Sequence, residues 1–545
     1  MTVLRSSLDV GSAQYQSRRE AMLAKLADLD AEHAKAIGGG GVKYVQRHRD
    51  RGKLTVRERI ELLIDPDSPF LELSALAGYG TGFPVGGSGV NGIGVVADTL
   101  VMISASDPTV RGGSTNPWSL RKSIRGMQIA IENRLPLINL VESGGADLPT
   151  QKEIFIPGGQ IFRDLTRMSA ADIPTIALVF GNSTAGGAYV PGMSDYVVMI
   201  DGRSKVFLAG PPLVKMATGE ESDDESLGGA SMHARQSGLA DFLATDEHDA
   251  LRLGRSIVAR LNRAGLGGPA DGAADRAPAE PAYDGEELLG IVPEDLKVPF
   301  DPREVIARIT DGSDFDEFKP LYGASLVTGW AAVHGYPIGI LANARGVLFS
   351  AESQKAAQFI QLANQVGVPL LFLQNTTGYM VGASYEQAGI IKHGAMMINA
   401  VANSQVPHLT IVMGASYGAG NYGMCGRAYD PRFLFTWPSA KSAVMGPAQL
   451  AGVLSIVGRQ SAVARGEPYD EDADVAMRAL VEEQIESESD AFFLSGRLYD
   501  DGVIDPRDTR SVLGLCLTVI ANGGGAQTAA ASRPAGASRF GIFRM

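Results

Sequence analysis

The feature of this sequence that most constrains its fold is an internal repeat. Lys122 stands 14 residues before a proline that opens an apolar segment, and Lys355 stands 14 residues before Pro369 in the same setting. In both halves the next apolar segment opens 38 residues after that proline, and residues 173–183 match residues 406–416 position by position. Equal spacing over such a length predicts two diverged copies of one structural unit.

Each copy alternates helices with apolar strands. A short upstream motif is shared as well, because residues 57–60, Asp65 and Phe70 recur as residues 303–306, Asp311 and Phe315. After it, each half has an amphipathic helix, an apolar strand, a glycine loop, another helix, another apolar strand and a second glycine loop. This alternation predicts an α/β fold with a mostly parallel sheet covered on both faces.

The length of 545 residues also requires more than one domain, because a single hydrophobic core seldom supports a chain of this size. Between positions 263 and 280 Gly, Ala, Pro and Asp dominate without hydrophobic periodicity, which is typical of an interdomain linker. We therefore predict an N-terminal helical extension (1–50), an N-terminal domain (51–265), a linker (266–284), a C-terminal domain (285–522) and a spacer with a docking tail (523–545).

The N-terminal segment carries two local signals. Ser17 followed by Glu20 predicts a capping box that opens a helix with Met22, Leu26 and Leu29 on one face. Two interpretations stay open for the basic cluster that follows, a solvated face or a contact with an anion or another subunit. The cluster consists of Arg47, His48, Arg49, Arg51 and Lys53.

Composition excludes several classes of protein. A net charge of −13 argues against a broad nucleic-acid surface. The two cysteines, Cys425 and Cys516, cannot form a disulfide framework or a four-cysteine zinc site. The apolar runs have strand length, and no secretory or transit pattern opens the chain, so we expect no membrane span and a cytoplasmic location.

Glycine-rich loops follow four of the apolar strands, at residues 143–146, 183–189, 375–379 and 416–422. Glycine lets the backbone approach a ligand closely, and a helix that starts after a strand presents free N–H groups. Two such amides that converge on one oxygen form an oxyanion hole. The alternative is that these glycines serve only tight turns, but their matched positions predict one hole in each half.

Side-chain catalysis finds little support in the sequence. We find no Gly-x-Ser-x-Gly elbow, no His-Glu-x-x-His motif and no Walker lysine loop. We expect hydrogen-bonding roles for His233, His393 and His408, a packing role for Cys425, and no metal site.

At these loops the sequence resembles the carboxyltransferase (β) subunits of biotin-dependent acyl-CoA carboxylases, and most closely those of 3-methylcrotonyl-CoA carboxylases. The resemblance covers nearly the whole chain. Its most specific motifs are residues 184–191, 207–215, 227–230, 417–427 and 540–545. It implies two tandem crotonase-like domains, each a ββα spiral, related by duplication.

The resemblance also implies the reaction. The carboxyl group of carboxybiotin, carried by a partner subunit, is transferred to an acyl-CoA, and the biotin ureido anion itself removes the substrate proton. The expected substrate is 3-methylcrotonyl-CoA, which gives 3-methylglutaconyl-CoA in leucine degradation. Other carboxylation substrates are alternatives, among them geranyl-, propionyl-, acetyl- and longer-chain acyl-CoA. A crotonase-type hydratase or isomerase, which needs a side-chain acid or base, and a non-catalytic scaffold are further alternatives.

By the same resemblance, each domain contributes one set of site residues. Gly145, Ala146, Gly186 and Gly187 are expected around the thioester oxygen. The biotin side is expected at Thr377, Gly378, Tyr379, Gly418, Ala419 and Gly420. Arg111, Lys122 and Arg125 are candidates for the CoA phosphates, with a solvated helix face as the alternative. Phe162 is a candidate for the acyl pocket, with core packing as its alternative.

The resemblance finally implies partners. No Ala-Met-Lys-Met biotinylation motif and no ATP-binding half is found, so a biotin carboxylase and biotin carrier α subunit is expected. Related sites form between the N-domain of one β subunit and the C-domain of another, which implies a β6 core in an α6β6 holoenzyme. Two departures from the family pattern are the hydroxyls within residues 375–379, where Asn-Ile-Thr-Gly-Phe is usual, and the long spacer at 523–537.

Overall fold

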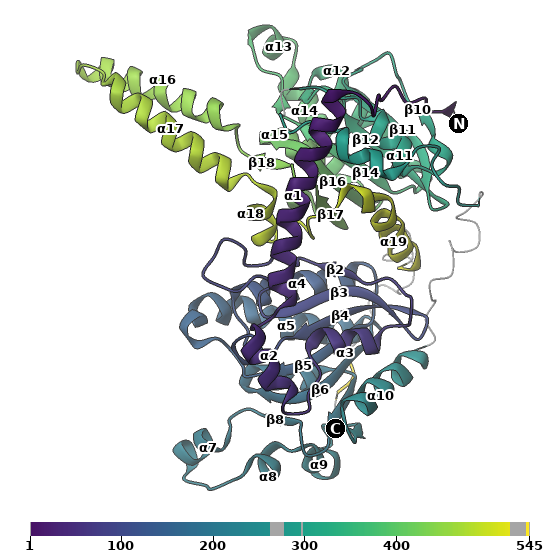
Figure 1. The fold of residues 1–545 in the computed structure, drawn as a ribbon, viewed down its shortest axis with the longest axis vertical. Helices are drawn as coiled ribbons and strands as arrows, with labels where there is room; N and C mark the ends of the chain where they lie inside the picture. Colours follow the sequence, from purple (N-terminus) through teal and green to yellow (C-terminus); the bar gives the residue numbers. More distant parts are fainter. Residues whose placement is uncertain (1, 262–276, 296–297, 524–540, 544–545) are drawn as a thin grey trace. The chain divides into compact units, whose positions relative to one another are not determined.

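The computed structural model describes residues 2–261, 277–295, 298–523 and 541–543. The chain forms two compact units, each with its own sheet and helices (Figure 1). Unit 1 comprises residues 1–29, 271–495 and 499–517, and unit 2 comprises residues 30–270, 496–498 and 518–545. Part of the predicted linker, residues 266–276, lies outside the described residues. No helix in the described ranges is both long and apolar enough to cross a membrane.

Unit 2 is built on one mixed sheet with the strand order β2-β3-β4-β5-β6-β7-β9, and β8 also pairs with β6. The first three strands are antiparallel neighbours and the others pair in parallel. The strands are β2 (Leu71–Leu73), β3 (Gly89–Val96), β4 (Thr99–Ser106), β5 (Leu137–Ser143), β6 (Thr175–Thr184), β7 (Tyr196–Ile200), β8 (Lys205–Phe207) and β9 (Phe242–Ala244). The helices are α2 (Val42–Arg49), α3 (Val56–Leu63), α4 (Pro117–Glu132), α5 (Gln151–Ala170), α6 (Tyr189–Met193), α7 (Pro211–Thr218), α8 (Asp224–Gly228), α9 (Ala230–Met232) and α10 (Glu247–Ala259).

Unit 1 repeats this sheet, with the order β1-β10-β11-β12-β14-β16-β17 and with β18 also paired to β16. Its strands are β1 (Thr2–Val3), β10 (Asp314–Glu317), β11 (Leu326–Val333), β12 (Tyr336–Asn343), β14 (Leu370–Thr376), β16 (His408–Tyr417), β17 (Phe433–Thr436) and β18 (Lys441–Ala443); β13 (Val347–Leu348) and β15 (Gly378–Tyr379) form a separate ribbon. Its helices are α11 (Arg303–Ile309), α12 (Ser350–Val366), α13 (Ala383–Gln387), α14 (Ile390–Asn403), α15 (Gly418–Gly423), α16 (Pro447–Arg465) and α17 (Glu471–Glu488). Helices α1 (Ala13–Ile37), α18 (Ala491–Gly496) and α19 (Thr509–Asn522) contribute residues to both units.

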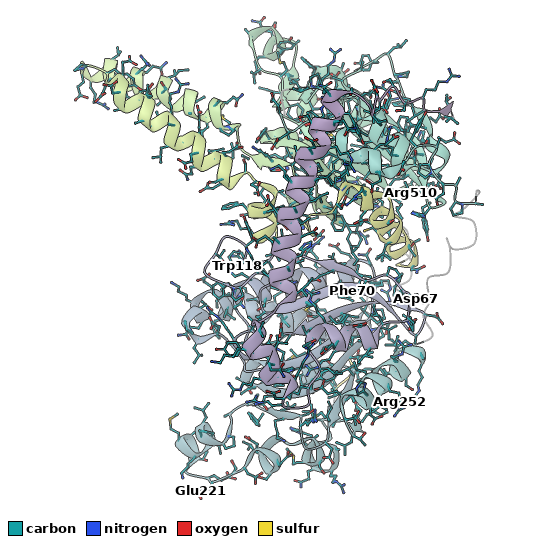
Figure 2. All side chains as sticks on the ribbon, in the orientation of Figure 1. Asp67, Phe70, Trp118, Glu221, Arg252 and Arg510 are labelled. Carbon is teal, nitrogen blue, oxygen red and sulfur yellow. The ribbon has the colours of Figure 1, made fainter. Side chains whose placement is uncertain are left out.

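The duplication extends to individual side-chain contacts. In unit 2 the carboxylate of Asp65 accepts hydrogen bonds from the backbone of the β3–β4 turn and pairs with Arg255 of α10. In unit 1 Asp311 binds the β11–β12 turn in the same way and pairs with Arg510 of α19, which is labelled in Figure 2. In each hairpin the turn N–H groups donate charge-assisted hydrogen bonds to the aspartate. The repeated aspartates therefore have a structural role.

A glycine in each hairpin makes room for an aromatic ring. A Cβ at Gly92 of β3 would overlap the ring of Phe70, which is labelled in Figure 2. A Cβ at Gly329 of β11 would lie 2.5 Å from the ring of Phe315. The repeated phenylalanines are therefore seated on strands that tolerate no larger residue at these two points.

The N-terminal helix begins earlier than the sequence predicted. Helix α1 starts at Ala13 instead of near Ser17. The cap is Ser12, whose hydroxyl accepts a hydrogen bond of 3.2 Å from the N–H of Tyr15. The predicted apolar face is confirmed, because the three residues that define it are buried: Met22, Leu26 and Leu29.

Candidate active site

The two glycine loops of unit 2 lie side by side at the carboxyl ends of β5 and β6. Ser143 at the end of β5 pairs with Ser183 near the end of β6. Beyond that pair, Gly145 has a φ of +95°, and a Cβ there would lie 3.2 Å from the carbonyl oxygen of Thr184. An L side chain is disfavoured on both counts, so glycine is needed for the two loops to meet.

The backbone of these loops leaves particular amides free. On either side of Ala146 the backbone pairs with Thr115: the N–H of Thr115 donates to the carbonyl oxygen of Gly145, and the N–H of Asp147 donates to the carbonyl oxygen of Thr115. The N–H of Ala146 itself takes part in no hydrogen bond among the described residues. The second loop is a short 3-10 helix that starts at Ala185. The first amides of such a helix precede its i→i+3 bonds, which leaves that of Gly186 without an intrahelical partner. Ala146 and Gly186 are also exposed, so a ligand can reach both amides.

Unit 1 has the same arrangement. Gly378 follows β14 and has a φ of +123°. A Cβ at Gly420 would lie 2.9 Å from the Cα of Gly378, so the two loops meet here. The ribbon pairing of Tyr379 with Leu348 uses the N–H of Met380 and leaves that of Tyr379 unused. Helix α15 starts at Gly418, and its first amides include those of Ala419 and Gly420.

One of the two hydroxyls that depart from the family pattern, that of Thr376, donates a hydrogen bond of 3.0 Å to the carbonyl oxygen of Gly346. Thr377, which matches the family pattern, donates its hydroxyl to the same oxygen at 3.1 Å. The N–H of Thr377 donates to the same oxygen. These hydroxyls therefore hold the loop before the ribbon against the end of β14, and the candidate amides stay available.

Carboxylates beside the unit 2 loops are already paired. Glu142 is buried, which alone raises its pKa, but the charges of Arg59 and Lys53 lower the pKa below its usual value. Asp147 accepts a hydrogen bond from Thr150 at 2.8 Å and pairs with Arg111 at 3.5 Å. Both carboxylates therefore have basic or hydroxyl partners in unit 2.

The buried Cys425 of unit 1 lies 3.2 Å from Nδ1 of His408 through its sulfur. Burial lowers the pKa of His408 to about 4 and raises that of Cys425, so both groups are neutral near pH 7. Both side chains are buried, and the imidazole also bonds to Ser404. The pair is consistent with the expected packing and hydrogen-bonding roles rather than with a reactive thiolate.

The three candidates for CoA phosphates lie in different surroundings. Lys122 is buried, with its ammonium 3.0 Å from the carbonyl oxygen of Gly89, and burial lowers its pKa to about 8. Lys122 therefore joins α4 to the start of β3, and this correction removes it from the phosphate candidates. Arg125 is half-buried on α4. Arg111 is partly exposed and stacks on the ring of Phe83.

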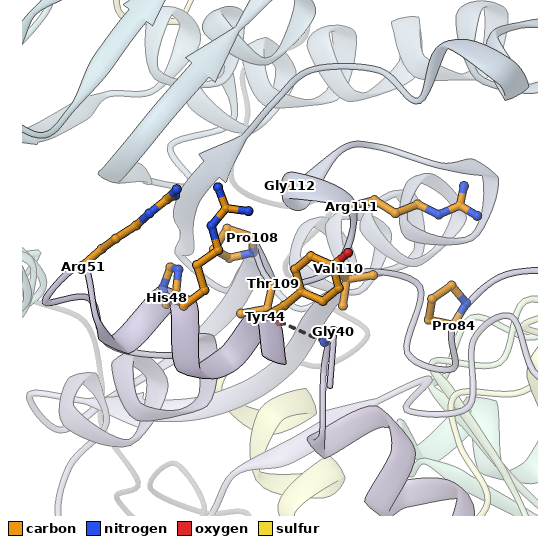
Figure 3. A pocket seen from close by; sticks show the side chains of 11 residues that line it. Gly40, Tyr44, His48, Arg51, Pro84, Pro108, Thr109, Val110, Arg111 and Gly112 are labelled. Carbon is orange, nitrogen blue, oxygen red and sulfur yellow. Dashed lines mark hydrogen bonds between the residues drawn. The ribbon is translucent and has the colours of Figure 1, made fainter. Parts of the chain in front are cut away.

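Arg111 borders a cavity of about 450 Å³ in unit 2 that also includes part of the basic cluster. Figure 3 shows Arg51 and Arg111 on opposite sides of Tyr44 at this cavity. In the described part of the chain neither Arg47 nor Arg51 has an ion-pair partner. Arg47 lies on α2, and Arg51, four positions later, lies just after it. The sequence showed the cluster but not that the chain brings it to the loop of Arg111.

One hydrogen bond connects the wall of the cavity to the first glycine loop of unit 2. Gly112 lines the cavity, and its carbonyl oxygen accepts a bond of 3.0 Å from the N–H of Gly144. The 3-10 turn at Arg111–Gly113 thus borders the cavity on one side and the first glycine loop on the other. No group of three or more metal-ligating side chains occurs within the described ranges.

Comparison with known proteins identifies the class. A family described as the carboxyl transferase domain matches residues 47–531. The chain therefore belongs to the carboxyl transferase family, and it is a carboxyltransferase (β) subunit of the biotin-dependent acyl-CoA carboxylases, as its sequence motifs predicted. It is 70% identical over 543 residues to the probable biotin-dependent acyl-coenzyme A carboxylase beta2 subunit of Mycobacterium tuberculosis, with 100% of each chain covered.

Two further relatives are informative. The chain is 47% identical over 551 residues to the mitochondrial methylcrotonoyl-CoA carboxylase beta chain of Arabidopsis thaliana, covering 100% of this chain and 92% of the relative. The crystal structure of the beta subunit of geranyl-CoA carboxylase from P. aeruginosa is similar with a TM-score of 0.90, at 44% identity and with 100% of both chains covered. The predicted crotonase-like α/β fold is confirmed.

Proposed function

We propose that the chain transfers the carboxyl group of carboxybiotin to 3-methylcrotonyl-CoA, with one oxyanion hole in each unit. The observation that carries the proposal is the two matched pairs of amides that have no hydrogen-bond partner among the described residues, Ala146 with Gly186 and Tyr379 with Ala419. Gly145, Gly418 and Gly420 allow close backbone approaches around them, and Gly187 and Gly378 belong to the same loops.

In unit 2 the amides of Ala146 and Gly186 hold the thioester oxygen. As the proton on the carbon chain leaves, negative charge develops on that oxygen, and two preorganised donors stabilise it. A single donor of this kind is worth about 10²–10³ in rate. No side-chain base is required here, which fits the paired state of Glu142 and Asp147.

In unit 1 the amides of Tyr379 and Ala419 hold the ureido oxygen of biotin. Carboxybiotin, when bound, supplies both the CO2 and the anion that removes the substrate proton. The residues present fit this group, because positions 378 and 420 are glycines that add no side chain to the loops and the Thr377 hydroxyl is bonded to Gly346. The role of unit 1 is to stabilise the charge on that oxygen and to orient the ring.

The CoA nucleotide is placed at the basic cavity. Arg47 and Arg51, which have no ion-pair partner among the described residues, line this cavity with Arg111 and suit a ligand that carries phosphates. The hydrogen bond from Gly144 to Gly112 joins the first glycine loop to the wall of this cavity. We keep Arg125 as a candidate and add Arg47 and Arg51.

Methylcrotonoyl-CoA carboxylase beta chains support the substrate assignment. Geranyl-CoA is a second candidate, because the geranyl-CoA carboxylase subunit has the same fold over its whole length. We further propose a biotin-bearing α subunit as partner and a β6 core in an α6β6 holoenzyme. The division at 51–265 and 285–522 and a cytoplasmic location, which suits two buried free cysteines, complete the proposal.

The test is carboxylation by the purified β subunit mixed with its α subunit, ATP, bicarbonate and a panel of acyl-CoA thioesters. We expect the highest kcat/KM with 3-methylcrotonyl-CoA. A preference for geranyl-CoA would replace that substrate with the second candidate. Turnover of enoyl-CoA with water and without biotin would contradict carboxyl transfer.

A further inference from the structure

The last described residues of the chain dock on the helix that frames the thioester loop. Gly541 packs on α5 so closely that a Cβ there would lie 2.7 Å from Oγ and 2.8 Å from Cβ of Ser169. The next residue, Ile542, donates its N–H to Oγ of Ser169 at 2.9 Å. Only a glycine fits at the point of contact, while the side chain of Ile542 is 64% exposed and so is not what seats the segment.

Ser169 is also the point where three other elements meet. Its hydroxyl donates to Asp195, which follows α6. Asp195 in turn accepts the N–H of Thr175 at the start of β6 and donates its own N–H to the hydroxyl of Thr175. The end of α5, the end of α6 and the start of β6 are therefore linked through one serine, and the terminal segment binds to that serine.

The helices linked in this way hold the residues around Gly186. Phe162 lies seven residues before Ser169, which places both on the same side of α5. A Cβ at Gly186 would lie 3.6 Å from the Phe162 ring, and that ring packs on Tyr189 of α6 with centroids 5.6 Å apart. A shift of α5 relative to α6 would move the ring over the candidate oxyanion loop.

We infer that residues 541–542 are a positioning segment, which locks α5 to α6 through Ser169 and so fixes Phe162 and the amide of Gly186 for the acyl-CoA. The inference rests on the proposed function of that loop. Gly541 and Ser169 are positioning residues, because neither touches the substrate. Small displacements of a site built from backbone amides are costly, so a contact remote from the reacting atoms can affect acyl-CoA use.

The test is Gly541→Ala in the full-length holoenzyme, with Gly452→Ala on α16 as the matched control, since a Cβ at Gly452 meets nothing within 4 Å. We expect Gly541→Ala to raise the KM for acyl-CoA by roughly threefold or more, with the KM for ATP unchanged. Ser169→Ala, which removes the acceptor, should act in the same direction. The double variant Gly541→Ala with Ser169→Ala should lose no more than the worse of the two single variants, because both changes break the same contact.

Hydrogen–deuterium exchange of α5 and α6 gives a second readout that does not depend on activity. We expect faster exchange in Gly541→Ala than in the wild type or in Gly452→Ala. If the wild type carboxylates no acyl-CoA, the proposed function fails, and the exchange data still decide whether the segment locks α5. Equal exchange and equal acyl-CoA KM in Gly541→Ala and Gly452→Ala would overturn the inference.

Discussion

Tyr379 carries a hydroxyl group that has no hydrogen-bond partner in the part of the chain that the structure describes. The ring packs against Gly394 and Gly423, and burial raises the pKa of its hydroxyl. An unpaired buried hydroxyl costs about 1–3 kcal/mol of stability. The sequence identified this hydroxyl as a departure from the family pattern, but spacing does not reveal which way a side chain points, and the ring turns toward α14 and α15.

At this residue we predict that Tyr379→Phe raises the Tm of the β subunit by about 2–4 °C, because the change removes the unsatisfied oxygen and keeps the ring. Activity should be retained, since the proposed donor is the backbone amide. Differential scanning calorimetry measures the shift. The control is Tyr283→Phe, where the hydroxyl bonds to Ser6 and Leu4 and the Tm should fall. Equal losses in both variants would contradict the prediction.

At the scale of elements, the helices and strands of the repeat were predicted in the right order, because hydrophobic patterning and spacing determine them. The start of α1 was wrong, since both Ser12 and Ser17 can cap a helix and the choice depends on tertiary packing. Tyr15, held by the Ser12 cap, packs on Gly290, which is distant in sequence. Helices α16 and α17 were not predicted; both carry several exposed apolar residues and lack a clear one-sided pattern.

For the end of α2 we predict that Arg47→Ala with Arg51→Ala raises the KM for acyl-CoA roughly tenfold, while the KM for the corresponding acyl-pantetheine stays unchanged. The reason is that only the CoA form carries the nucleotide phosphates. Steady-state kinetics with both thioesters measures the difference. Arg252→Ala, an exposed arginine on α10 labelled in Figure 2, is the control. Equal loss with both thioesters would remove the phosphate role.

Between α4 and β3 the buried Lys122 predicts a pH dependence of stability. Burial lowers its folded pKa to about 8 from 10.5, so between these values the unfolded chain binds the proton more strongly. Its contribution to stability therefore rises from pH 8 to pH 10. We predict that the Tm of the wild type relative to Lys122→Met rises over that range and is constant from pH 6 to 7. Lys215→Met, at an exposed lysine, should show no such rise.

At the scale of the whole molecule, the duplication was the most predictable feature. Equal spacing in the two halves indicates that both copies have the same strands. The matched contacts of Asp65 and Asp311 with their β-hairpin turns confirm this. The site was predictable to the level of its loops. Which amides in each loop lack a hydrogen-bond partner depends on how the loop pairs with Thr115 in unit 2 and with Leu348 in unit 1. These short pairings lie outside the main strands, and no sequence pattern predicts them.

The duplication also predicts a division of labour that two matched substitutions can test. Gly145 and Gly378 occupy equivalent positions with φ values of +95° and +123°, so Gly→Ala strains each loop in the same way. If unit 2 binds the thioester and unit 1 binds biotin, Gly145→Ala should lower kcat/KM for acyl-CoA by about tenfold to a hundredfold and leave the KM for the biotin-bearing subunit unchanged. Gly378→Ala should show the opposite pattern. Circular dichroism checks that each variant is folded. If both variants changed the same one of these two kinetic constants, the assignment of one ligand to each unit would be wrong.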